Sequence, residues 1–293
     1  MNVKKHIVII NQNTRTRKLK KLFLEMEKTF QEKQFSYCFY TTEKEEDAIA
    51  ILTKQTQPCR FYICGGDGTL HQAVNALKNT PHEIVLLPCG TGNDFSRMLK
   101  EHKDIHAHFH KSLQREASLI DVLKVNDTIC INAACFALDH DIANHVHDHS
   151  WHYTPRKLAY LVTVLRRIFV YRCAHLEIIV DNENKFSGNA LFATCNNAKF
   201  YGGGFCMTPN ANLQDGNMDF CIIREFPRWK ILYKFPPFLM KQPQKMKKCI
   251  SFQCKKADIQ STQGVNVDGE CYKEHSLTIE VLPQALRLVN EIK

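Results

Sequence analysis

Short apolar runs alternate with amphipathic segments along the first part of the chain. Buried strands are predicted for the apolar runs at residues 6–10, 35–40, 60–64 and 83–88. The segments between them are interpreted as helices, over residues 16–30, 46–54 and 70–77. In the first of these, apolar side chains recur at helical spacing, at Leu19, Leu22, Phe23, Met26 and Phe30. Strands that alternate with helices indicate a mostly parallel sheet flanked by helices.

After about residue 120 the pattern changes to strand-like runs separated by short polar turns, such as "TICINAACFAL", "AHLEIIVD", "MDFCIIRE" and "SLTIEVL". One predicted helix, over residues 155–171, interrupts these runs. This half therefore predicts an antiparallel sandwich or barrel-like domain. We expect an α/β domain over residues 1–123, with 276–293 packing back on it, and a β-rich domain over 124–275.

Length and composition agree with this division. The 293 residues exceed the usual size of a single compact core, so two domains are expected. The chain is 44% hydrophobic and 24% charged, as globular proteins are. Its apolar runs are shorter than the roughly 18–20 residues that span a bilayer, and the run near the N-terminus is too short for a signal peptide. We therefore expect a cytoplasmic protein.

The 13 cysteines are an odd number, and none of them forms a Cys-x-x-Cys pair. Several lie in apolar, strand-like runs, where cysteine behaves as a small hydrophobic residue. We interpret them as reduced and structural, because disulfides are rare in the cytosol. Their spacing does not support a zinc site.

The net charge of +9 indicates an anionic partner. A nucleic acid, a phosphate-bearing substrate and a membrane surface would all satisfy this charge, which by itself does not choose among them.

A glycine-rich junction, "GGDGT", lies between a predicted strand and a predicted helix at residues 65–69. Glycine loses the most backbone freedom on folding, so three glycines here indicate a ligand that approaches the backbone closely. Backbone N–H groups and the start of the next helix favour a phosphate. Asp67 would repel phosphates unless a cation intervened, which favours a Mg²⁺-nucleotide. A tight turn in a sheet protein is the alternative.

A second glycine loop, "PCGTGNDFSRML", follows the next predicted strand, and Asn93 and Asp94 are expected to open a helix there. The carboxyl ends of parallel strands face one edge of a sheet, where ligands bind in open α/β folds. Neither loop matches the Walker A or the G-x-G-x-x-G pattern.

Taken together, five motifs resemble the diacylglycerol kinase catalytic domain, which shares its fold with sphingosine kinases and NAD kinases. They are "GGDGTL", "PCGTGNDFSR", "IDVLKV", "PNANLQDGNMD" and "VNVDGE". The resemblance is strongest to the soluble bacterial diacylglycerol kinases. It implies an N-terminal Rossmann-like α/β domain with a parallel sheet, a C-terminal β-sandwich-like domain and a nucleotide cleft between them. It also implies phosphoryl transfer from ATP to a lipid hydroxyl.

The resemblance implies nucleotide-binding residues in four segments. The glycine loops would hold the triphosphate of ATP, through Gly65, Gly66, Asp67, Gly68, Thr69, Leu70, His71 and Thr91. After the first strand, "NQNT" would supply Asn11, Gln12, Asn13 and Thr14. This segment departs from the family's N-P-x-[ST]-G, because Gln12 replaces proline and Arg15 replaces glycine. Thr41 would lie near the nucleoside.

Asp268 and Glu270, in "VDGE", match the catalytic segment of the family, with Asp67 as a further catalytic residue. An alcohol has a pKa far above 7, so a carboxylate must accept its proton during attack. We favour Glu270 as the base and Asp268 as its neighbour, and the reverse assignment stays open. Asp-Gly between apolar runs also predicts a hairpin turn, which is compatible with this role.

Clustered oxygens of Asp215, Asn212 and Asn217 suit a hard cation, and the resemblance implies a structural Mg²⁺ there. The same letters also fit a polar loop ahead of a strand. The resemblance further implies that Asp67, Asp94 and Asp121 form a connected acidic network.

Two further segments bear on partners. Residues 227–248 interleave lysines and arginine with aromatic side chains, which suits an anionic membrane surface and would also suit RNA. Histidines crowd residues 139–152, where we favour a solvated loop over a metal site.

Our leading hypothesis is a peripheral membrane kinase that makes phosphatidic acid from ATP and diacylglycerol, with no nucleic acid as partner. Dimers are common among the proteins it resembles, so a homodimer stays open. Another acceptor, such as a sphingoid base or phosphatidylglycerol, is the nearest alternative. A non-catalytic nucleotide-binding regulator is the alternative from a different class, and "GTGNDF" disfavours an NAD kinase.

Overall fold

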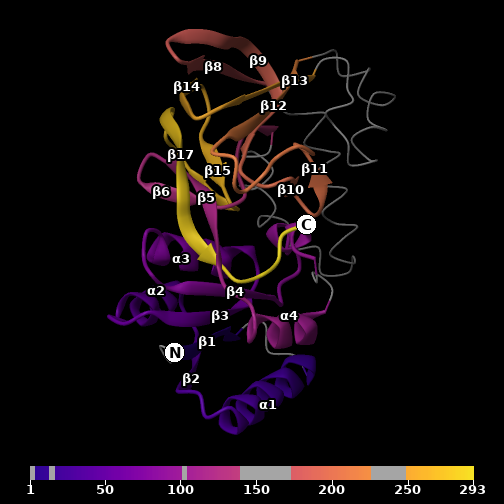
Figure 1. Ribbon diagram of the computed structural model, residues 1–293. Coiled ribbons are helices and arrows are strands. Elements are labelled where there is room, and N and C mark those ends of the chain that lie inside the picture. The colour runs from indigo at the N-terminus through magenta and orange to yellow at the C-terminus, as the bar shows by residue number, and fades with distance from the viewer. Residues whose placement is uncertain (1–3, 13–16, 101–103, 139–172, 226–248) are drawn as a thin grey trace, which may run out of the picture. The chain divides into compact units, whose positions relative to one another are not determined.

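The computed structural model describes residues 4–12, 17–100, 104–138, 173–225 and 249–293 (Figure 1). The chain divides into two compact units. Unit 1 comprises residues 1–122, 202–204 and 282–293, and unit 2 comprises residues 123–201 and 205–281. The predicted helix at 155–171, the histidine-rich segment, the basic segment at 227–248 and the residues Asn13 and Thr14 lie outside the described residues.

Unit 1 is built on a parallel sheet, as the alternation of strands and helices predicted. Its strands are β1 (Lys5–Asn11), β2 (Tyr37–Thr42), β3 (Cys59–Gly65), β4 (Glu83–Pro88) and the C-terminal part of β17 (Ser276–Leu288). Each pairs in parallel with its neighbour in the order β2-β1-β3-β4-β17. The carboxyl ends of β1, β2, β3 and β4 therefore share one edge of the sheet.

Helices cover both faces of this sheet (Figure 1). On one face, α1 (Arg17–Glu32) and α4 (Ile105–Ser112) pack through Leu22, Met26, Phe30 and Phe109 onto alternate strand residues such as Val8 and Tyr62. The other face carries α2 (Glu45–Thr53) and α3 (Asp67–Leu77), which contact each other.

One local prediction is wrong, and one helix was not predicted. The helix expected to open at Asn93 and Asp94 is a single 3₁₀ turn, Phe95–Met98. Asn93 has a φ of 50°, which no helix accepts, and its side chain is used to close the loop on Gly90. Helix α4 was not predicted, because three histidines interrupt the apolar pattern of "IHAHFHKS".

The end of the chain completes unit 1. Val289 N–H donates to the Ile84 carbonyl at 2.9 Å, which extends the pairing of β17 with β4. The Asn290 amide then takes the place of a strand, because it accepts from the Leu86 N–H at 2.6 Å and donates to the Leu86 carbonyl at 3.0 Å.

Unit 2 is a β domain, in agreement with the predicted β-rich half. Its longer strands are β7 (Ala133–Ala137), β8 (Ala174–Val180), β9 (Glu183–Asn196), β12 (Met218–Arg224), β13 (Cys249–Cys254) and β14 (Lys256–Ser261). The shorter strands are β6 (Thr128–Cys130), β10 (Phe200–Tyr201), β11 (Phe205–Cys206), β15 (Val265–Val267) and β16 (Glu270–Tyr272). Strand β5 (Ser118–Val125) and β17 each begin in one unit and end in the other.

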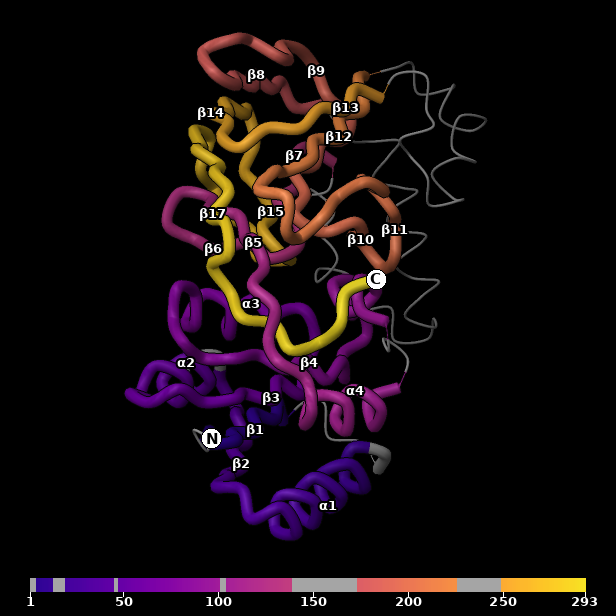
Figure 2. The backbone as a smooth tube through the Cα atoms, viewed as in Figure 1, coloured from indigo at the N-terminus to yellow at the C-terminus, as the bar shows by residue number. Residues whose placement is uncertain are grey.

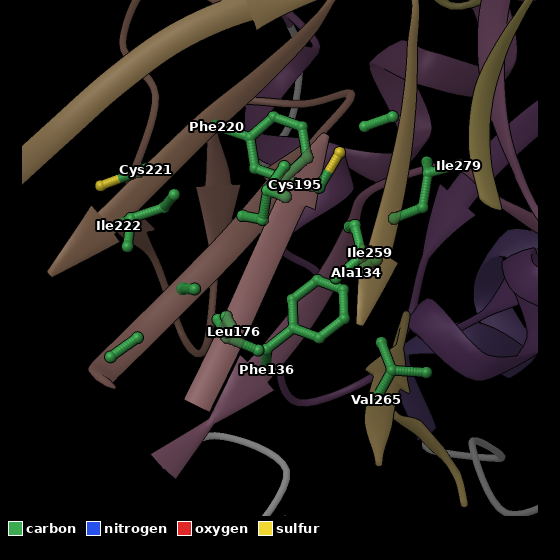
Figure 3. Close-up of a cluster of buried hydrophobic side chains, with 14 of the residues drawn as sticks. Ala134, Phe136, Leu176, Cys195, Phe220, Cys221, Ile222, Ile259, Val265 and Ile279 are labelled. Carbon is green, nitrogen blue, oxygen red and sulfur yellow. The ribbon is translucent and has the colours of Figure 1, made fainter. Parts of the chain in front are cut away.

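The main path of this sheet runs β16-β15-β7-β9-β8-β14-β17, and β12 joins β9 to β13. Its pairs are antiparallel, and Figure 2 follows their backbone. The inward side chains make one apolar cluster, which includes Phe136, Leu176, Phe220, Ile259 and Ile279 (Figure 3). Burial of this cluster is the main force that holds the unit together.

Candidate active site

The first glycine loop connects β3 to α3 in unit 1. A Cβ on Gly65 would lie 2.4 Å from Thr69 Oγ1, so the turn needs glycine to let the start of α3 fold back on the strand. Gly66 caps the helix, and its carbonyl accepts from the Leu70 N–H at 3.1 Å. Four backbone N–H groups at a helix start lack intrahelical partners, so this end of α3 is suited to an anion.

The second glycine loop lies directly against the first. A Cβ on Gly90 would lie 2.5 Å from Gly66 Cα, and Cys89 N–H donates to the Gly65 carbonyl at 2.8 Å. Asn93 fixes the second loop, since its Oδ1 accepts from Gly90 N–H at 3.0 Å and its Nδ2 donates to the Gly90 carbonyl. The two loops predicted to share an edge are thus packed backbone to backbone.

Gly68 stands apart from these packing glycines. It is exposed in the first turn of α3, and an added Cβ would meet no atom within 4 Å. Its backbone is helical, so no unusual φ requires glycine either. Glycine costs a helix about 1 kcal/mol relative to alanine. The folded chain gives no internal reason for glycine here, and close approach of an external group supplies one.

Side chains from β1 and β2 reach the same edge. Asn11 Nδ2, at the end of β1, donates to Thr69 Oγ1 at 3.3 Å, which joins the predicted "NQNT" segment to the glycine loop. Gln12 is exposed. At the end of β2, Thr41 is exposed, whereas Thr42 is buried and its hydroxyl donates to the Ile10 carbonyl at 3.4 Å.

The other predicted nucleotide contacts differ in their exposure. Thr91 is exposed on the second loop. Leu70 belongs to the core, with 1% of its surface exposed, and its N–H is engaged by Gly66. His71 is also buried, and its Nε2 lies 3.3 Å from Asn75 Nδ2. A direct role of Leu70 and His71 in binding a nucleotide stays a prediction.

Three carboxylates of unit 1 were predicted to form an acidic network: Asp67, Asp94 and Asp121. A Cβ on Gly92 would lie 2.8 Å from Asp67 Oδ2, so the second loop passes close to this carboxylate. Asp94 accepts from the Gly203 N–H at 2.8 Å and from Arg97 Nε at 3.2 Å. Asp121, which is buried, accepts from the Gln284 N–H at 2.8 Å. Asp94 and Asp121 thus tie distant parts of unit 1 together, and the acidic network stays a prediction.

The "VDGE" segment of unit 2 is the predicted hairpin. Val267 pairs with Glu270, so Asp268 and Gly269 form the two-residue turn between β15 and β16, with φ values of 53° and 108°. Two consecutive positive φ angles are typical of the type I′ turn that Asp-Gly favours.

Asp268 holds the neighbouring loop. One carboxylate oxygen accepts from the N–H groups of Asn132 and Ala133, at 2.9 and 3.1 Å, and the other accepts from the Ile131 N–H at 2.8 Å. Cys130 Sγ lies 3.2 Å from the same carboxylate. Burial, together with this carboxylate, raises the pKa of the Cys130 thiol well above its ordinary value. Asp268 therefore has its lone pairs engaged by the backbone.

Glu270 presents a contrasting environment. It is exposed at the start of β16, and within the described ranges no hydrogen bond or ion pair engages its carboxylate. Of the two acids in "VDGE", Glu270 is the one available to accept a proton from another molecule.

The predicted Mg²⁺ ligands lie in one loop of unit 2, ahead of β12. Asn212 Oδ1 accepts from the Gln214 N–H at 3.2 Å, and Asp215 Oδ1 accepts from the Asn217 N–H at 3.0 Å. In the described part of the chain, no group of three His, Cys, Asp or Glu side chains is placed to hold a metal. A cation here would therefore need amide or main-chain oxygens as well.

Asp219, at the base of this loop, has surroundings that suit a nearby cation. It is 8% exposed, and its Oδ2 has no hydrogen-bond partner among the described residues, while Oδ1 accepts from Gln253 Nε2 at 3.1 Å. Burial raises the pKa of Asp219, the Gln253 bond lowers it, and the charge of Asp215 raises it further, with a net rise. A divalent cation would relieve this excess of negative charge, so the residues present fit Mg²⁺.

Sequence reasoning missed two residues that shape the site. Asn93 closes the second loop, and Gly203, with a φ of 83°, brings its N–H to Asp94. The "GGG" at 202–204 was the available signal, because three adjacent glycines indicate backbone that other residues rarely adopt.

Comparison with known proteins identifies the family of this chain. Residues 5–125 match the diacylglycerol kinase catalytic domain, and residues 133–290 match the YegS C-terminal NAD kinase beta sandwich-like domain. A Shewanella frigidimarina protein described as "Probable lipid kinase YegS-like" is 30% identical over 249 residues, which are 78% of this chain and 76% of that protein. The chain belongs to the YegS-like lipid kinase family. The predicted family is thereby confirmed, and its members are transferases.

Two further comparisons bear on this lipid kinase. A Mycobacterium tuberculosis protein described as a diacylglycerol kinase is 23% identical over 235 residues, 78% of this chain and 75% of that one. A crystal structure titled as a diacylglycerol kinase from Bacillus anthracis has a TM-score of 0.75 at 18% identity and covers 99% of this chain and 97% of that one. An Archaeoglobus fulgidus NAD kinase in complex with ATP has a TM-score of 0.56 at 12% identity, covering 98% and 94%. At these identities the structures establish the fold, which confirms the predicted fold class.

No helix in the described part of this lipid kinase is both long enough and apolar enough to cross a membrane.

Proposed function

We propose that this lipid kinase transfers the γ-phosphoryl group of ATP to the free hydroxyl of diacylglycerol and releases phosphatidic acid. The relatives described as diacylglycerol kinases support this acceptor. The observation that carries the proposal is the pair of interlocked glycine loops, with Gly68 open at the start of α3. Such a surface offers the N–H groups and the dipole of a helix start to phosphate oxygens and leaves room for them to approach.

In this proposal unit 1 binds the triphosphate. The N–H groups of Gly66, Asp67 and Gly68 donate to phosphate oxygens, and the Thr69 and Thr91 hydroxyls lie on the same two loops. Phosphoryl transfer depends mainly on positioning and on stabilisation of charge, so rigid loops suit the reaction. The backbone contact between Gly66 and Gly90 supports this rigidity.

Glu270 is the general base in this proposal. It accepts the hydroxyl proton as the hydroxyl oxygen attacks the γ-phosphorus and the bond to ADP breaks. Asp268 positions this hairpin through its three backbone hydrogen bonds and does not itself take the proton. The contrast between an engaged Asp268 and an exposed Glu270 supports this choice between two assignments that the sequence left open.

Mg²⁺ enters the proposal at two places. Bound with ATP, it neutralises charge on the phosphates, and Asp67 is the carboxylate on the glycine loop that suits it. A structural Mg²⁺ would be held by Asp215 with oxygens of Asn212 and Asn217, next to the buried Asp219.

An anionic membrane surface is the proposed partner, because diacylglycerol resides in a bilayer and the chain carries a net charge of +9. We therefore propose peripheral association with the cytoplasmic face of the membrane.

The test uses radiolabelled ATP and the full chain in mixed micelles that contain diacylglycerol, a sphingoid base or phosphatidylglycerol. Labelled phosphatidic acid is the expected product, and it should disappear with Glu270→Gln. Label on a different lipid would show that diacylglycerol is not the acceptor, although the protein would still be a lipid kinase. Binding of ATP with no transfer to any lipid would indicate a regulator.

A further inference from the structure

Two cysteines face each other across neighbouring strands of unit 2. Cys221 lies on β12 and Cys249 is the first residue of β13. The strands are antiparallel, with Cys221 opposite Ser251 and Ile223 opposite Cys249, so the two cysteines are diagonal neighbours on one face. Their sulfur atoms are 3.3 Å apart, and both thiols are free.

The two thiols have different surroundings. Cys221 has none of its surface exposed and lies at one edge of the apolar cluster (Figure 3). Cys249 is half-buried, so small molecules reach it more readily. A partly accessible thiol next to a buried one is the arrangement of a reactive cysteine and its resolving partner.

Hydrogen bonding reinforces this difference. The Cys221 thiol, against the opposing effect of burial, lowers the pKa of Cys249 to about 7, with help from the Ser251 hydroxyl and the Ile222 N–H. The Cys249 contact and burial raise the pKa of Cys221 above its ordinary value. The thiolate is the nucleophilic form of cysteine, so Cys249 is the reactive member at neutral pH.

We propose that Cys221 and Cys249 are a redox modification site, which a hydroperoxide converts to a reversible disulfide. The Cys249 thiolate attacks the peroxide, the O–O bond breaks, and hydroxide or alkoxide leaves with a proton as water or alcohol. Cys249 becomes a sulfenic acid. The Cys221 sulfur then attacks the Cys249 sulfur and loses its proton, and the S–O bond breaks to release water. Two thiols are oxidised by two electrons, and one peroxide is reduced.

The strand geometry allows the bond to form with a small movement. The sulfur atoms have to close from 3.3 Å to about 2.05 Å, the length of a disulfide. Ile223 and Cys249 are the final pair of the β12–β13 ladder, so the adjustment falls at its end. A bound metal ion is a less suitable explanation of the pair, because the described residues provide no third ligand of the usual kind.

Peroxide treatment of the full chain tests the proposal. After exposure to hydrogen peroxide, differential alkylation and peptide mass spectrometry should find Cys221 joined to Cys249, with loss of two hydrogen atoms, and dithiothreitol should reverse it. In Cys249→Ser the linkage should be absent. In Cys221→Ser, dimedone should trap Cys249 as a sulfenic acid, which distinguishes the attacking thiol from the resolving one. Cys271→Ser is the matched control, because Cys271 is the exposed cysteine of the described residues and its loss should leave the linkage intact.

If either serine variant fails to fold, the wild-type chain still decides the matter. Cys249 should react with iodoacetamide faster than Cys271 at pH 7, with a rate midpoint near pH 7. Oxidation of Cys271 or of other thiols while Cys221 and Cys249 stay open to alkylation would overturn the proposal. This result is independent of kinase activity, so it stands or falls separately from the proposed function.

Discussion

The glycines of the two loops have different roles in this lipid kinase. Gly65 and Gly90 are needed because a Cβ would collide with Thr69 or with the backbone of the facing loop, and a Cβ on Gly66 would make a tight contact of 3.2 Å with Gly90 Cα. Gly68 has open space where a Cβ would lie, so packing within the described chain gives no reason for glycine there, and the proposed phosphate supplies one. Packing and ligand binding can thus be separated residue by residue within one motif.

Gly68→Ala should separate folding from binding. Alanine favours the helix by about 1 kcal/mol over glycine, so stability should stay equal or rise. The new methyl group would occupy the space into which phosphate oxygens are proposed to enter, and the KM for ATP should rise at least about tenfold, which corresponds to 1.4 kcal/mol. Thermal unfolding and steady-state kinetics measure the two effects. Gly90→Ala is the contrasting variant and should lose stability, since its Cβ would meet Gly66 Cα at 2.5 Å.

The two acids of "VDGE" should respond differently to removal of their charge. Glu270→Gln should lower kcat by at least about 10²-fold, the usual effect of losing a general base, and leave the melting temperature unchanged. Asp268→Asn should lower stability by about 1–3 kcal/mol, because an amide cannot accept all three N–H groups that the carboxylate accepts. Denaturant titration and kinetics of the pair test this assignment. Equal loss of activity at unchanged stability in both variants would contradict it.

His6, at the start of β1, should make unit 1 sensitive to acid. Burial, with help from Arg60, lowers the pKa of His6 from 6.5 to about 4. Its ring stacks on Phe35 at 4.5 Å and its Nδ1 lies 3.0 Å from the Tyr62 hydroxyl, so the folded state keeps it neutral. The unfolded chain binds its proton first, so stability is lost as pH falls from about 6.5 towards 4, by about 3 kcal/mol.

Replacing this histidine should flatten the pH dependence. His6→Asn removes the titration, although the lost stacking lowers stability at all pH values. The difference between wild type and variant should therefore shrink between pH 6.5 and 4 in chemical denaturation. A difference that is constant with pH would show that His6 does not bind a proton on unfolding.

Whole strands and helices were predictable where the chain repeats a simple pattern. The parallel strands of unit 1 and the Asp-Gly hairpin follow from apolar runs and turn residues that act locally. Helix α4 did not follow, because its histidines interrupt the apolar pattern, and the 3₁₀ turn at Phe95–Met98 did not follow, because Asp94 beside it is held by the distant Gly203. The different surroundings of Asp268 and Glu270 likewise could not be predicted, because they depend on backbone N–H groups from residues 131–133, far away in the sequence.

The Asn290 side chain does what a neighbouring strand would do. Its amide hydrogen-bonds the backbone N–H and carbonyl of Leu86 in β4, beyond the end of β17. Asn290→Ala should leave the buried N–H and carbonyl of Leu86 without this partner. An unsatisfied buried group costs about 1–3 kcal/mol, so the two together should lower stability by a few kcal/mol. Urea unfolding measures this loss. Asn290→Asp should also lose stability, because it keeps the acceptor for the Leu86 N–H but places a buried carboxylate against the Leu86 carbonyl.

At the scale of the whole molecule, the net charge of +9 makes membrane attachment testable. Sedimentation with vesicles that contain anionic lipids should bring down this lipid kinase, and vesicles of neutral lipid alone should bring down much less. Binding should weaken with added salt, because the Debye length falls from about 10 Å at 0.1 M to about 3 Å at 1 M. Binding that ignores both lipid charge and salt would contradict an electrostatic attachment.

The place of β17 at the end of the sequence determines the order in which the two units can complete their folding. Unit 1 begins near the N-terminus, yet one strand of its sheet and the Asn290 side chain that pairs with Leu86 come from residues 282–293, after all of unit 2. A ribosome therefore releases the material for unit 2 before it releases the last piece of unit 1. Although domains nearest the N-terminus usually finish folding first during synthesis, unit 1 here must wait for its last strand.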